Sequence, residues 1–311
     1  MKKVLPLLLV LLLSLSFVQP QSAAAKVMWG NMELKKGQIG RVTMLKDVNI
    51  YTKSDDEYVK SGTAKKNQLN RVYTNRNGYL GIGGGKYIKN DSSVKYETPS
   101  QSRLQAANGV RIVKKTYPGT NFIYPQVTNM FDKKAEKKIN DELYSIAQSI
   151  NETIISFEEE EASAREDWDD YGYGDFWDWE YDFSFEIHYN QEHRLSVLFR
   201  EYAYTGGAHG MSGIYTLNFD CLTGNTINLS SAIKGKTKTV RNYAYNDLRN
   251  QEKRGEEMLL LESVNEITIN DSDRPWVYNA KGVKLFFQEY EVKFPYASGN
   301  PEVIVPAVVY N

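Results

Sequence analysis

Cysteine and histidine are almost absent from this sequence. Its 311 residues include one cysteine, Cys221, so the chain can form no internal disulfide and no cysteine-only metal site. His188 and His193 are five residues apart, which puts them on opposite faces of a strand and off the spacing of a helical metal pair. His209 lies between glycines with no G-x-S-x-G pattern nearby, which favours a structural turn histidine over a catalytic base. We therefore expect no metal, no cofactor and no enzymatic activity.

The chain also lacks long apolar runs, apart from one at its start. Residues 4–18 are apolar, follow Lys2 and Lys3, and precede Ala23-Ala24-Ala25. This is the layout of a secretory signal peptide, and the run is short for a membrane-spanning helix. We expect residues 1–25 to be a cleaved signal, so that the protein is secreted or held in a Gram-positive cell wall and has no membrane segment afterwards. The alternative is an uncleaved N-terminal anchor.

The formal net charge of −1 hides an asymmetry between the two parts of the chain. Residues 26–100 have a net charge of +7 and residues 101–311 a net charge of −10. Within the second part, residues 157–182 hold twelve acids and one base. Two regions of opposite sign predict two different partners, and a nucleic acid would be repelled by the larger region.

The acidic segment 158–182 is also rich in aromatic residues, and we predict that its rings are exposed for binding. Exposed tryptophan and tyrosine anchor interfaces and stack on sugars. The predicted binding residues are Trp168, Asp169, Asp170, Tyr171, Tyr173, Asp175, Phe176, Trp177, Asp178, Trp179 and Tyr181. Three alternatives remain: a solvated insertion without a binding role, a calcium loop, and a pair of catalytic carboxylates.

Periodicity predicts an α+β protein with a mostly antiparallel sheet and two main helices packed on it. Apolar residues spaced by three and four predict a helix over 132–157 with Asp132 as N-cap, and a second helix over 236–254. Gly172 and Gly174 are expected to exclude helix from the acidic segment. Alternating patterns predict strands, which we place at 110–114, 122–127, 183–189, 195–202, 213–219, 283–287 and 303–309.

The basic region 26–97 predicts a small β-module, followed by a serine-rich linker over 98–108. Its glycines at 81–85 are expected to form bulges or a tight corner rather than a phosphate loop. The segments 29–30, 33–40 and 83–88 resemble a bacterial SH3-like domain of secreted Bacillus wall proteins. The resemblance implies a small β-barrel.

Residues 109–311 carry five short segments, in order, that resemble a second family. They are 124–127, 138–140, 204–210 with Thr205, Gly206, Gly207 and His209, 218–229, and 290–299. The family is the extracytoplasmic domain shared by the sigma-V anti-sigma factor and a Bacillus peptidoglycan deacetylase. In the anti-sigma factor it is a lysozyme receptor, and in the deacetylase it is a non-catalytic accessory. The deacetylase's Thr-Phe-Asp-Asp and H-x-x-x-H motifs are missing from this sequence, and no sigma-binding segment is expected.

Together these observations predict a non-enzymatic binding protein of the cell envelope. The basic module would hold wall polymer or peptidoglycan, and the acidic domain would bind a cationic protein such as lysozyme, or a peptidoglycan fragment. The alternative is an accessory of, or an enzyme in, peptidoglycan modification.

Overall fold

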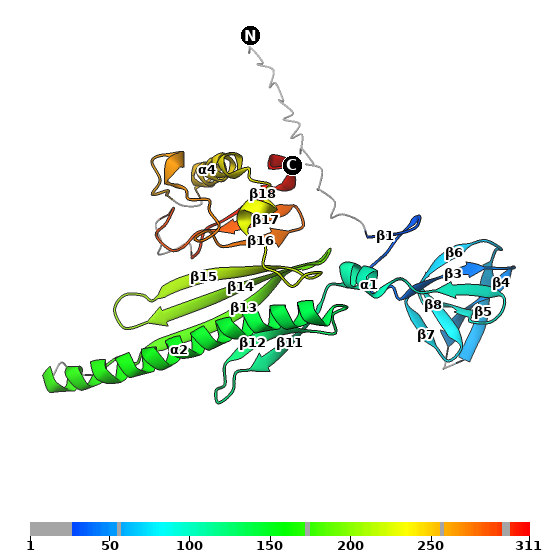
Figure 1. Ribbon diagram of the computed structural model, residues 1–311, viewed down its shortest axis with the longest axis horizontal. Helices are drawn as coiled ribbons and strands as arrows, with labels where there is room; N and C mark the ends of the chain where they lie inside the picture. Colours follow the sequence, from blue (N-terminus) through cyan, green and yellow to red (C-terminus); the bar gives the residue numbers. More distant parts are fainter. Residues whose placement is uncertain (1–26, 55–56, 172–174, 256–257, 294–298) are drawn as a thin grey trace, which may run out of the picture.

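The computed structural model describes residues 27–54, 57–171, 175–255, 258–293 and 299–311 (Figure 1). The predicted signal peptide, the two glycines Gly172 and Gly174, and Tyr173 lie outside these ranges. Across the described ranges, no helix combines the length and the apolar character needed to cross a bilayer. The cleavage and secretion of the chain stay predictions.

The N-terminal module is built from short antiparallel strands in two main sheets. One sheet has the order β10-β3-β6 and the other the order β5-β4-β9-β8-β7, beside a small β1-β2 pair. Their buried side chains, among them Val42, Met44, Leu80 and Ile88, meet in one core. No single closed barrel forms in the described part of the module, so the SH3-like barrel stays a prediction. The strands are β1 (Met28–Trp29), β2 (Met32–Glu33), β3 (Gly40–Met44), β4 (Val48–Ser54), β5 (Glu57–Ala64), β6 (Leu69–Val72), β7 (Thr74–Arg76), β8 (Tyr79–Gly83), β9 (Lys86–Lys89) and β10 (Val94–Glu97).

The glycines of this module form the predicted bulge. The register of β8 against β9 shifts between Gly81 and Gly83, and three consecutive glycines at 83–85 have positive φ. Glycine adopts this backbone conformation at little steric cost, which explains the run of three.

A helix, α1 (Gln101–Asn108), occupies most of the segment that was predicted to be a linker. Ser100 accepts a hydrogen bond from the amide of Arg103 and caps its start. Gln105 is buried, and its amide donates to the carbonyl of Cys221 at 3.1 Å. The polar, serine-rich composition predicted a linker, but Ser100 is a helix cap and the helix packs on the second domain.

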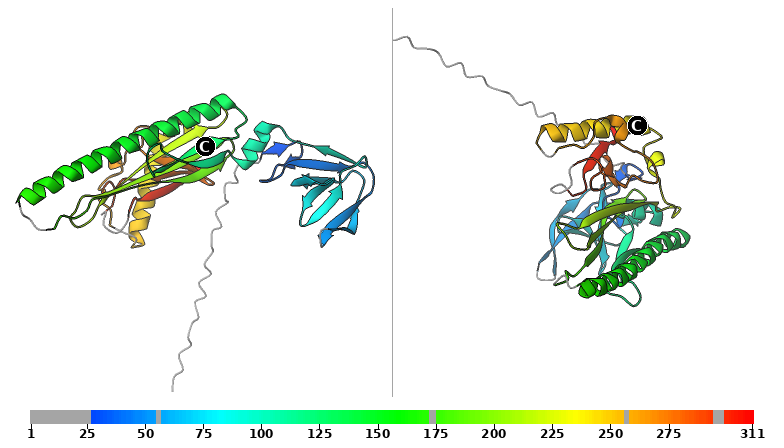
Figure 2. Two further views of the ribbon diagram at one scale, coloured as in Figure 1. Left: turned by 90° about the horizontal axis from the view of Figure 1, so that it is seen from below. Right: turned by 90° about the vertical axis from the view of Figure 1, so that its left-hand side faces the viewer.

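The second domain stacks two sheets between two helices (Figures 1 and 2). Helix α2 covers the sheet β13-β14-β15, and α4 covers the sheet β16-β17-β18. The two sheets meet through Leu198, Ile214, Val277 and Phe286. The predicted α+β class with antiparallel pairing is confirmed, but the two main helices lie on separate sheets rather than on one. The elements are β11 (Arg111–Thr116), β12 (Ile123–Thr128), α2 (Lys133–Tyr171), β13 (Glu180–Gln191), β14 (Arg194–Tyr204), β15 (Met211–Asp220), α3 (Leu229–Ala232), α4 (Thr237–Lys253), η1 (Val264–Glu266), β16 (Trp276–Asn279), β17 (Gly282–Phe286), β18 (Glu302–Pro306) and η3 (Ala307–Val309).

Helix α2 starts where the sequence predicts. A carboxylate oxygen of Asp132 accepts hydrogen bonds from the amides of Lys134 at 2.7 Å and Ala135 at 3.0 Å. The Asn140 side chain bonds to both the amide and the carbonyl of Val127, which fixes the helix to β12. The first part of α2 buries the apolar positions of the predicted stripe, among them Ile139, Leu143 and Ile150.

The end of α2 lies fourteen residues beyond the predicted boundary, at Tyr171 rather than 157. The apolar stripe ends near Phe157, but glutamate, alanine and arginine are strong helix formers without any stripe. The segment 158–171, predicted to be non-helical, therefore continues the helix and projects past the sheet (Figures 1 and 2).

Candidate binding surface

The loop 205–210 between β14 and β15 lies at the centre of the candidate surface. Gly206 and Gly207 have φ values of 96° and 90°, a conformation that favours glycine. The hydroxyl of Tyr204 donates to the carbonyl of Gly207 at 3.1 Å and holds the turn. A β-carbon placed on Gly206 would lie 3.5 Å from the Trp177 ring. The acidic segment and the family segment, predicted separately, are thus in contact.

Tyr202 and Met211 lie on the two strands that flank this loop, with their side chains on opposite faces of the sheet, because Tyr202 pairs with Ser212 and Met211 pairs with Ala203. The Tyr202 ring packs over Gly210, where a β-carbon would come within 2.5 Å of it. Tyr202 is 36% exposed and Met211 65% exposed. Trp177, at 61%, adds a large exposed ring beside Gly206. The loop is therefore surrounded by exposed apolar side chains of the kind that mark interaction sites.

His209 joins the loop to a turn 81 residues further along the chain. Its Nδ1 lies 2.8 Å from the Gly210 carbonyl oxygen, and its Nε2 lies 3.1 Å from the hydroxyl of Tyr290. Only a donor satisfies a carbonyl oxygen, so Nδ1 carries the proton and Nε2 accepts from the tyrosine. This arrangement supports the structural role that the sequence predicts for His209.

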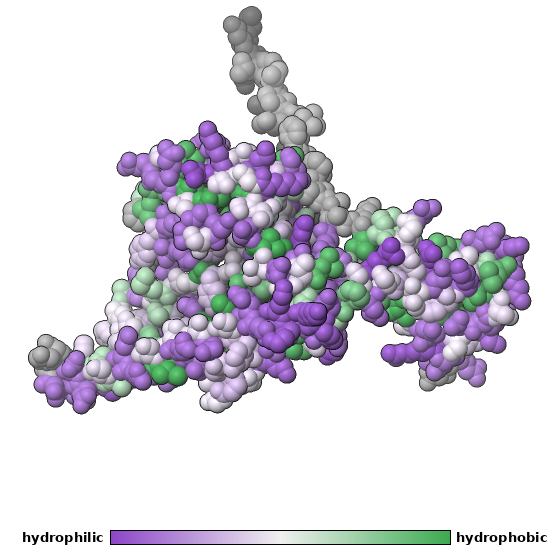
Figure 3. Space-filling model, in the orientation of Figure 1, coloured by the Kyte–Doolittle hydropathy of each residue, from purple (hydrophilic) through white to green (hydrophobic). Residues whose placement is uncertain are grey.

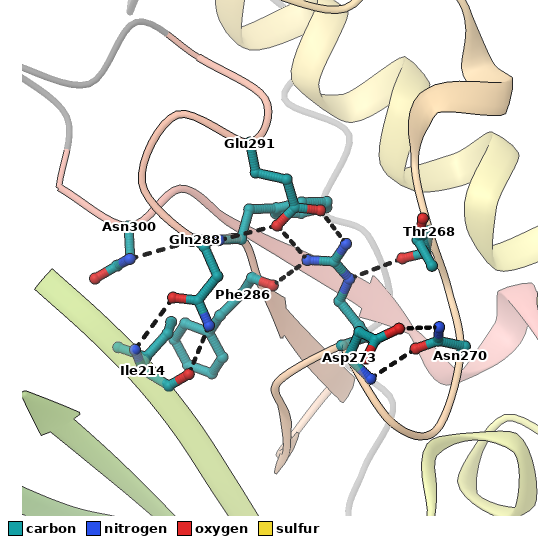
Figure 4. A network of polar contacts seen from close by, with 10 residues as sticks. Ile214, Thr268, Asn270, Asp273, Phe286, Gln288, Glu291 and Asn300 are labelled. Carbon is teal, nitrogen blue, oxygen red and sulfur yellow. Dashed lines mark hydrogen bonds and ion pairs between the residues drawn. The ribbon is translucent and has the colours of Figure 1, made fainter.

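A polar network positions the turn that carries Tyr290 (Figure 4). The buried guanidinium of Arg274 forms a two-pronged ion pair with Glu291 and also donates to the carbonyl of Phe286 at 2.7 Å. The Gln288 side chain bonds to the amide and the carbonyl of Ile214 on β15, at 3.2 and 2.7 Å. Because a buried charge left unpaired costs several kcal/mol, this network fixes the turn against the sheet.

The acidic arm, residues 158–171 and 175–182, carries a cluster of its own rings. Phe176 packs edge-on against Trp168 at 5.9 Å and lies 6.5 Å from Trp179, which in turn contacts Phe157 at 5.3 Å. Phe157 also contacts Tyr181, at 5.6 Å. This corrects the predicted exposure of the rings. Trp168, Phe176, Trp179 and Tyr181 are half-buried against each other, and among the described rings of the arm only Trp177 is exposed.

Arg165 and Glu161, on the last part of α2, hold the segment that precedes β13. The guanidinium of Arg165 bonds to Glu161 at 3.0 Å and to Asp178 at 2.7 Å, and it lies 4.4 Å above the Phe176 ring. Glu161 also accepts from the amide of Trp179 at 3.1 Å. The single base of the segment therefore holds the arm together instead of neutralising its acids generally.

The remaining acids of the arm face solvent. Asp169, Asp170 and Asp175 are exposed, and Asp178 is exposed beside Arg165. The last turn of α2 contains no base, so its acids add to the partial negative charge of a helix C-terminus. Figure 3 shows the projecting arm as mainly hydrophilic. The tip thus combines strong negative charge with the nearby Trp177. The side chain of Tyr171 lies outside the described ones, as does Tyr173.

Glu201 lies on β14 on the side that faces α2, next to Tyr181 and Tyr215. Burial raises the pKa of its carboxyl, with a smaller opposing effect from Tyr181. Burial also raises the pKa of the Tyr181 and Tyr215 hydroxyls. Glu201 was not among the predicted site residues, although strand alternation with the apolar Val197 and Phe199 places it on the buried face.

The remaining candidates for chemistry have structural surroundings. Burial raises the pKa of the Cys221 thiol to about 12, which disfavours the reactive thiolate. Burial lowers the pKa of His188 and of His193. Among the described residues, no group of three or more histidine, cysteine or acidic side chains is placed to hold a metal ion. The binding residues predicted in the arm stay predictions.

Tyr202, Met211 and Tyr290 were also absent from the predicted site. Tyr202 and Met211 could have been found from their positions beside the glycine-rich loop. Tyr290 opens the segment 290–299 of the family resemblance, but its contact with His209 depends on the packing of two sheets that are distant in the sequence.

Two family models match consecutive parts of the second domain. Residues 114–212 match the model described as Deacetylase PdaC, and residues 230–307 match a protein of unknown function, DUF3298. No curated protein matches this chain at a significant level.

Solved structures of DUF3298 proteins are similar to the chain. A member from Bacteroides fragilis is 16% identical, covers 59% of this chain and 79% of its own, and has a TM-score of 0.48. A protein from Pseudomonas aeruginosa is 12% identical, covers 65% of this chain and 93% of its own, and has a TM-score of 0.41. The predicted deacetylase-associated region is confirmed by the family models, whereas the SH3-like module stays a prediction. The chain therefore carries a PdaC-type region followed by a DUF3298 region.

Proposed function

We propose that this protein is a non-enzymatic accessory protein of the cell envelope that binds a cationic protein, with lysozyme as the first candidate. The PdaC-type and DUF3298 regions support a role at the envelope. The observation that carries the proposal is the contact between the acidic arm and the loop 205–210 at Trp177. At this place the negative charge of the arm lies next to the exposed ring of Trp177, outside the protein's core.

Electrostatics gives the surface its selectivity for a positive partner. The segment 157–182 has twelve acids against one base, and Arg165 is already engaged within the arm. A field of one sign raises the association rate of an oppositely charged partner by about ten- to a thousandfold at low salt. Trp177, the exposed ring beside the loop 205–210, then supplies apolar area that slows dissociation.

The basic N-terminal module would keep the protein at the wall. Its net charge of +7 over residues 26–100 fits an anionic wall polymer or peptidoglycan as ligand. In this arrangement an SH3-like module retains a secreted chain in the wall, while the acidic domain faces the partner. The protein would be secreted through its N-terminal signal and would use no cofactor.

Binding of a hen-type lysozyme to the full chain, measured by calorimetry at low and raised salt, tests the cationic partner. The triple variant Asp169→Asn, Asp170→Asn, Asp175→Asn removes three charges from the arm. We expect its dissociation constant to rise about tenfold or more at low salt, with the gap closing as salt rises. The matched control Asp141→Asn, Glu142→Gln, Glu152→Gln removes three exposed charges from the part of α2 that covers the sheet. It should change affinity less than about threefold.

A lysozyme whose lysines are acetylated provides a second control, because acetylation removes its positive charge. The acetylated lysozyme should bind the full chain far more weakly than the unmodified lysozyme does. Absence of wild-type binding at low salt, or equal losses in both triple variants, would reject the proposed docking surface.

The match to Deacetylase PdaC favours one second candidate, an accessory role in peptidoglycan modification. Incubation of the full chain with purified peptidoglycan, followed by assay of released acetate and soluble fragments, separates the two. Release by this chain alone would replace the non-enzymatic proposal with an enzymatic one.

A further inference from the structure

The five-stranded sheet of the N-terminal module has one face that carries tyrosines and cations together. The register pairs Tyr51 with Tyr87 and with Lys60, and it pairs Tyr79 with Lys89 and with Arg76. Directly paired residues of antiparallel strands point to the same face. Lys53 pairs with Tyr58 in the same way. The face therefore holds four tyrosines and four cations, namely Tyr51, Tyr58, Tyr79, Tyr87, Lys53, Lys60, Arg76 and Lys89.

The opposite face of this sheet is the core of the module. Leu80 and Ile88, which alternate with the tyrosines along β8 and β9, are buried in it. The tyrosines are half-buried, and Lys60, Arg76 and Lys89 are exposed. The tyrosine face is thus an outer surface with its polar groups toward solvent.

The four rings pack on one another as one cluster. Tyr58 and Tyr79 are stacked with ring centroids 3.6 Å apart. Tyr51 meets Tyr79 edge-on at 5.6 Å, and Tyr87 meets Tyr58 edge-on at 5.3 Å. Because Tyr58 and Tyr79 stack on each other, each has one flat face that a ligand cannot use. The cluster is a stiff platform rather than a set of separate stacking sites.

The cations are spread across the sheet instead of converging on one point. They come from β5, β4, β9 and β7, and neighbouring strands lie about 4.8 Å apart. Glu57 is the one acid in these five strands, and its pairing with Ser54 places it on the opposite face. A row of separate positive charges fits a ligand that carries one negative charge per repeat.

We propose that this tyrosine face binds a phosphodiester-linked polyol or sugar polymer. Lysine and arginine are strong ligands for phosphate oxygens, and an extended polymer meets one cation after another as it crosses the strands. Hydroxyl groups of the polymer bond to side chains between the cations, including those of Asn49 and Thr63, which the register places on this face. The inference rests on the part of the proposed function that gives the basic module a wall polymer as ligand, and it does not depend on the cationic partner.

The ring geometry favours this ligand over the other common phosphodiester polymer, a single-stranded nucleic acid. Proteins bind single strands largely by stacking bases on free aromatic faces. Here Tyr58 and Tyr79 stack on each other, and Tyr51 and Tyr87 lie nearly perpendicular to the ring that each contacts, so every ring of the cluster already packs on another. A polyol chain needs charge and hydroxyl contacts but no free ring face.

The test is retention of the full chain on immobilised poly(glycerol phosphate) over a range of salt concentrations. Dextran serves as a neutral polymer, and an oligothymidylate of equal phosphate number serves as the nucleic acid. The variant Lys60→Gln, Lys89→Gln removes two charges from the face, and the control Lys36→Gln, Lys66→Gln removes two exposed charges elsewhere in the module. Equal melting temperatures of the variants show that the module is folded.

We expect the wild type to bind the phosphate polymer at low salt, to release it as salt rises, and to ignore dextran. The face variant should lose about fivefold or more in affinity, and the control less than about twofold. The variant Tyr51→Phe, Tyr87→Phe, which keeps the rings, should bind more weakly than the wild type.

The possible failures are distinguishable. No wild-type binding at low salt would overturn both this site and the wall-polymer part of the proposed function. Equal losses in the two lysine variants would overturn the site while leaving the ligand class in place. Tighter binding of the oligothymidylate than of poly(glycerol phosphate) would overturn the choice of ligand.

Discussion

The two parts of helix α2 are continuous in structure but depend on different physical interactions. The proximal part, residues 133–157, buries Ile139, Leu143 and Ile150 against the sheet. The distal part, residues 158–171, has no fully buried side chain among its described residues. Packing stabilises the first, whereas helix propensity, the Arg165 contacts and a ring cluster stabilise the second. Because the distal part contributes little to the core, its positions can be acidic without loss of buried packing.

The distal part also places acids where a helix disfavours them. Asp167, Asp169 and Asp170 lie near the C-terminal end of α2, and its last turn has no base. Each such acid costs a few tenths of a kcal/mol or more, because the helix end carries partial negative charge. A cationic partner would relieve that repulsion. The arm without a partner is therefore less stable than it would be with neutral or basic residues at these positions. This agrees with the proposed binding role.

Proline substitutions should separate the two parts most strongly. Ala147 is fully buried in the proximal part, and Ala162 is exposed in the distal part. Proline removes a helix hydrogen bond and clashes with the preceding turn, at a cost of about 3 kcal/mol or more. We expect Ala147→Pro to prevent stable folding and Ala162→Pro to keep the melting temperature near that of the wild type while lowering helical circular dichroism. Global unfolding by Ala162→Pro would show that the arm belongs to the folding core.

Side-chain truncations should show the same contrast on a smaller scale. Leu143→Ala should lower the free energy of unfolding by about 2–5 kcal/mol, because its side chain is buried against the sheet. Trp168→Ala should cost about 1 kcal/mol, mainly its edge-on contact with Phe176. Urea unfolding at fixed pH measures both. Equal losses of unfolding free energy in the two variants would contradict the division of α2 into a packed proximal part and an unpacked distal part.

Glu201 tests the boundary between the two parts, since it lies next to Tyr181, which contacts Phe157. Burial raises the pKa of Glu201 above its ordinary 4.5, so the folded state holds this proton more tightly than the unfolded state. Its contribution to stability is therefore lost as the pH rises from 4.5 through the raised pKa. Glu201→Gln should melt higher than the wild type at pH 7, with the gap shrinking toward pH 4. A gap independent of pH would contradict this assignment.

Charge reversal at the tip should give the smallest change in stability. Asp169→Lys and Asp170→Lys place positive charge at the C-terminal end of α2, and each should stabilise the helix by about 0.3–1 kcal/mol at low salt. The same substitutions should weaken binding of the cationic probe. Thermal melts and calorimetry on the same samples check both effects. If the lysine variants gained both stability and affinity for the cationic probe, the negative charge of the arm would not be what binds the probe.

The sequence predicted features that depend on local patterns. The Asp132 cap, the proximal stripe of α2, the antiparallel strands and the glycine bulge all follow from spacing or from single residue types. The end of α2 was missed because an acidic run without an apolar stripe was taken as non-helical, although glutamate and alanine favour helix. The two-residue turn at Glu192 and His193, both with positive φ, lacks the asparagine and glycine that usually mark such a hairpin.

The candidate site was predicted only in part for a related reason. Charge and ring content identified the arm, and the family resemblance identified the loop 205–210. Their contact at Trp177 and Gly206 depends on the pairing of β13 with β14, which sets Glu180 opposite Tyr204. The position of Tyr290 depends on the Arg274–Glu291 pair, which joins the segment before β16 to the turn after β17. Such contacts leave no local pattern in a single sequence.

Hydrogen exchange of the full chain with and without a hen-type lysozyme shows whether the arm is the docking surface. We expect slower exchange in the distal part of α2, in residues 175–181 and in the loop 205–210, with no change in the proximal part of α2 or in the N-terminal module. Protection confined to the N-terminal module or to the proximal part, with the arm unchanged, would contradict the claim that the arm is the docking surface.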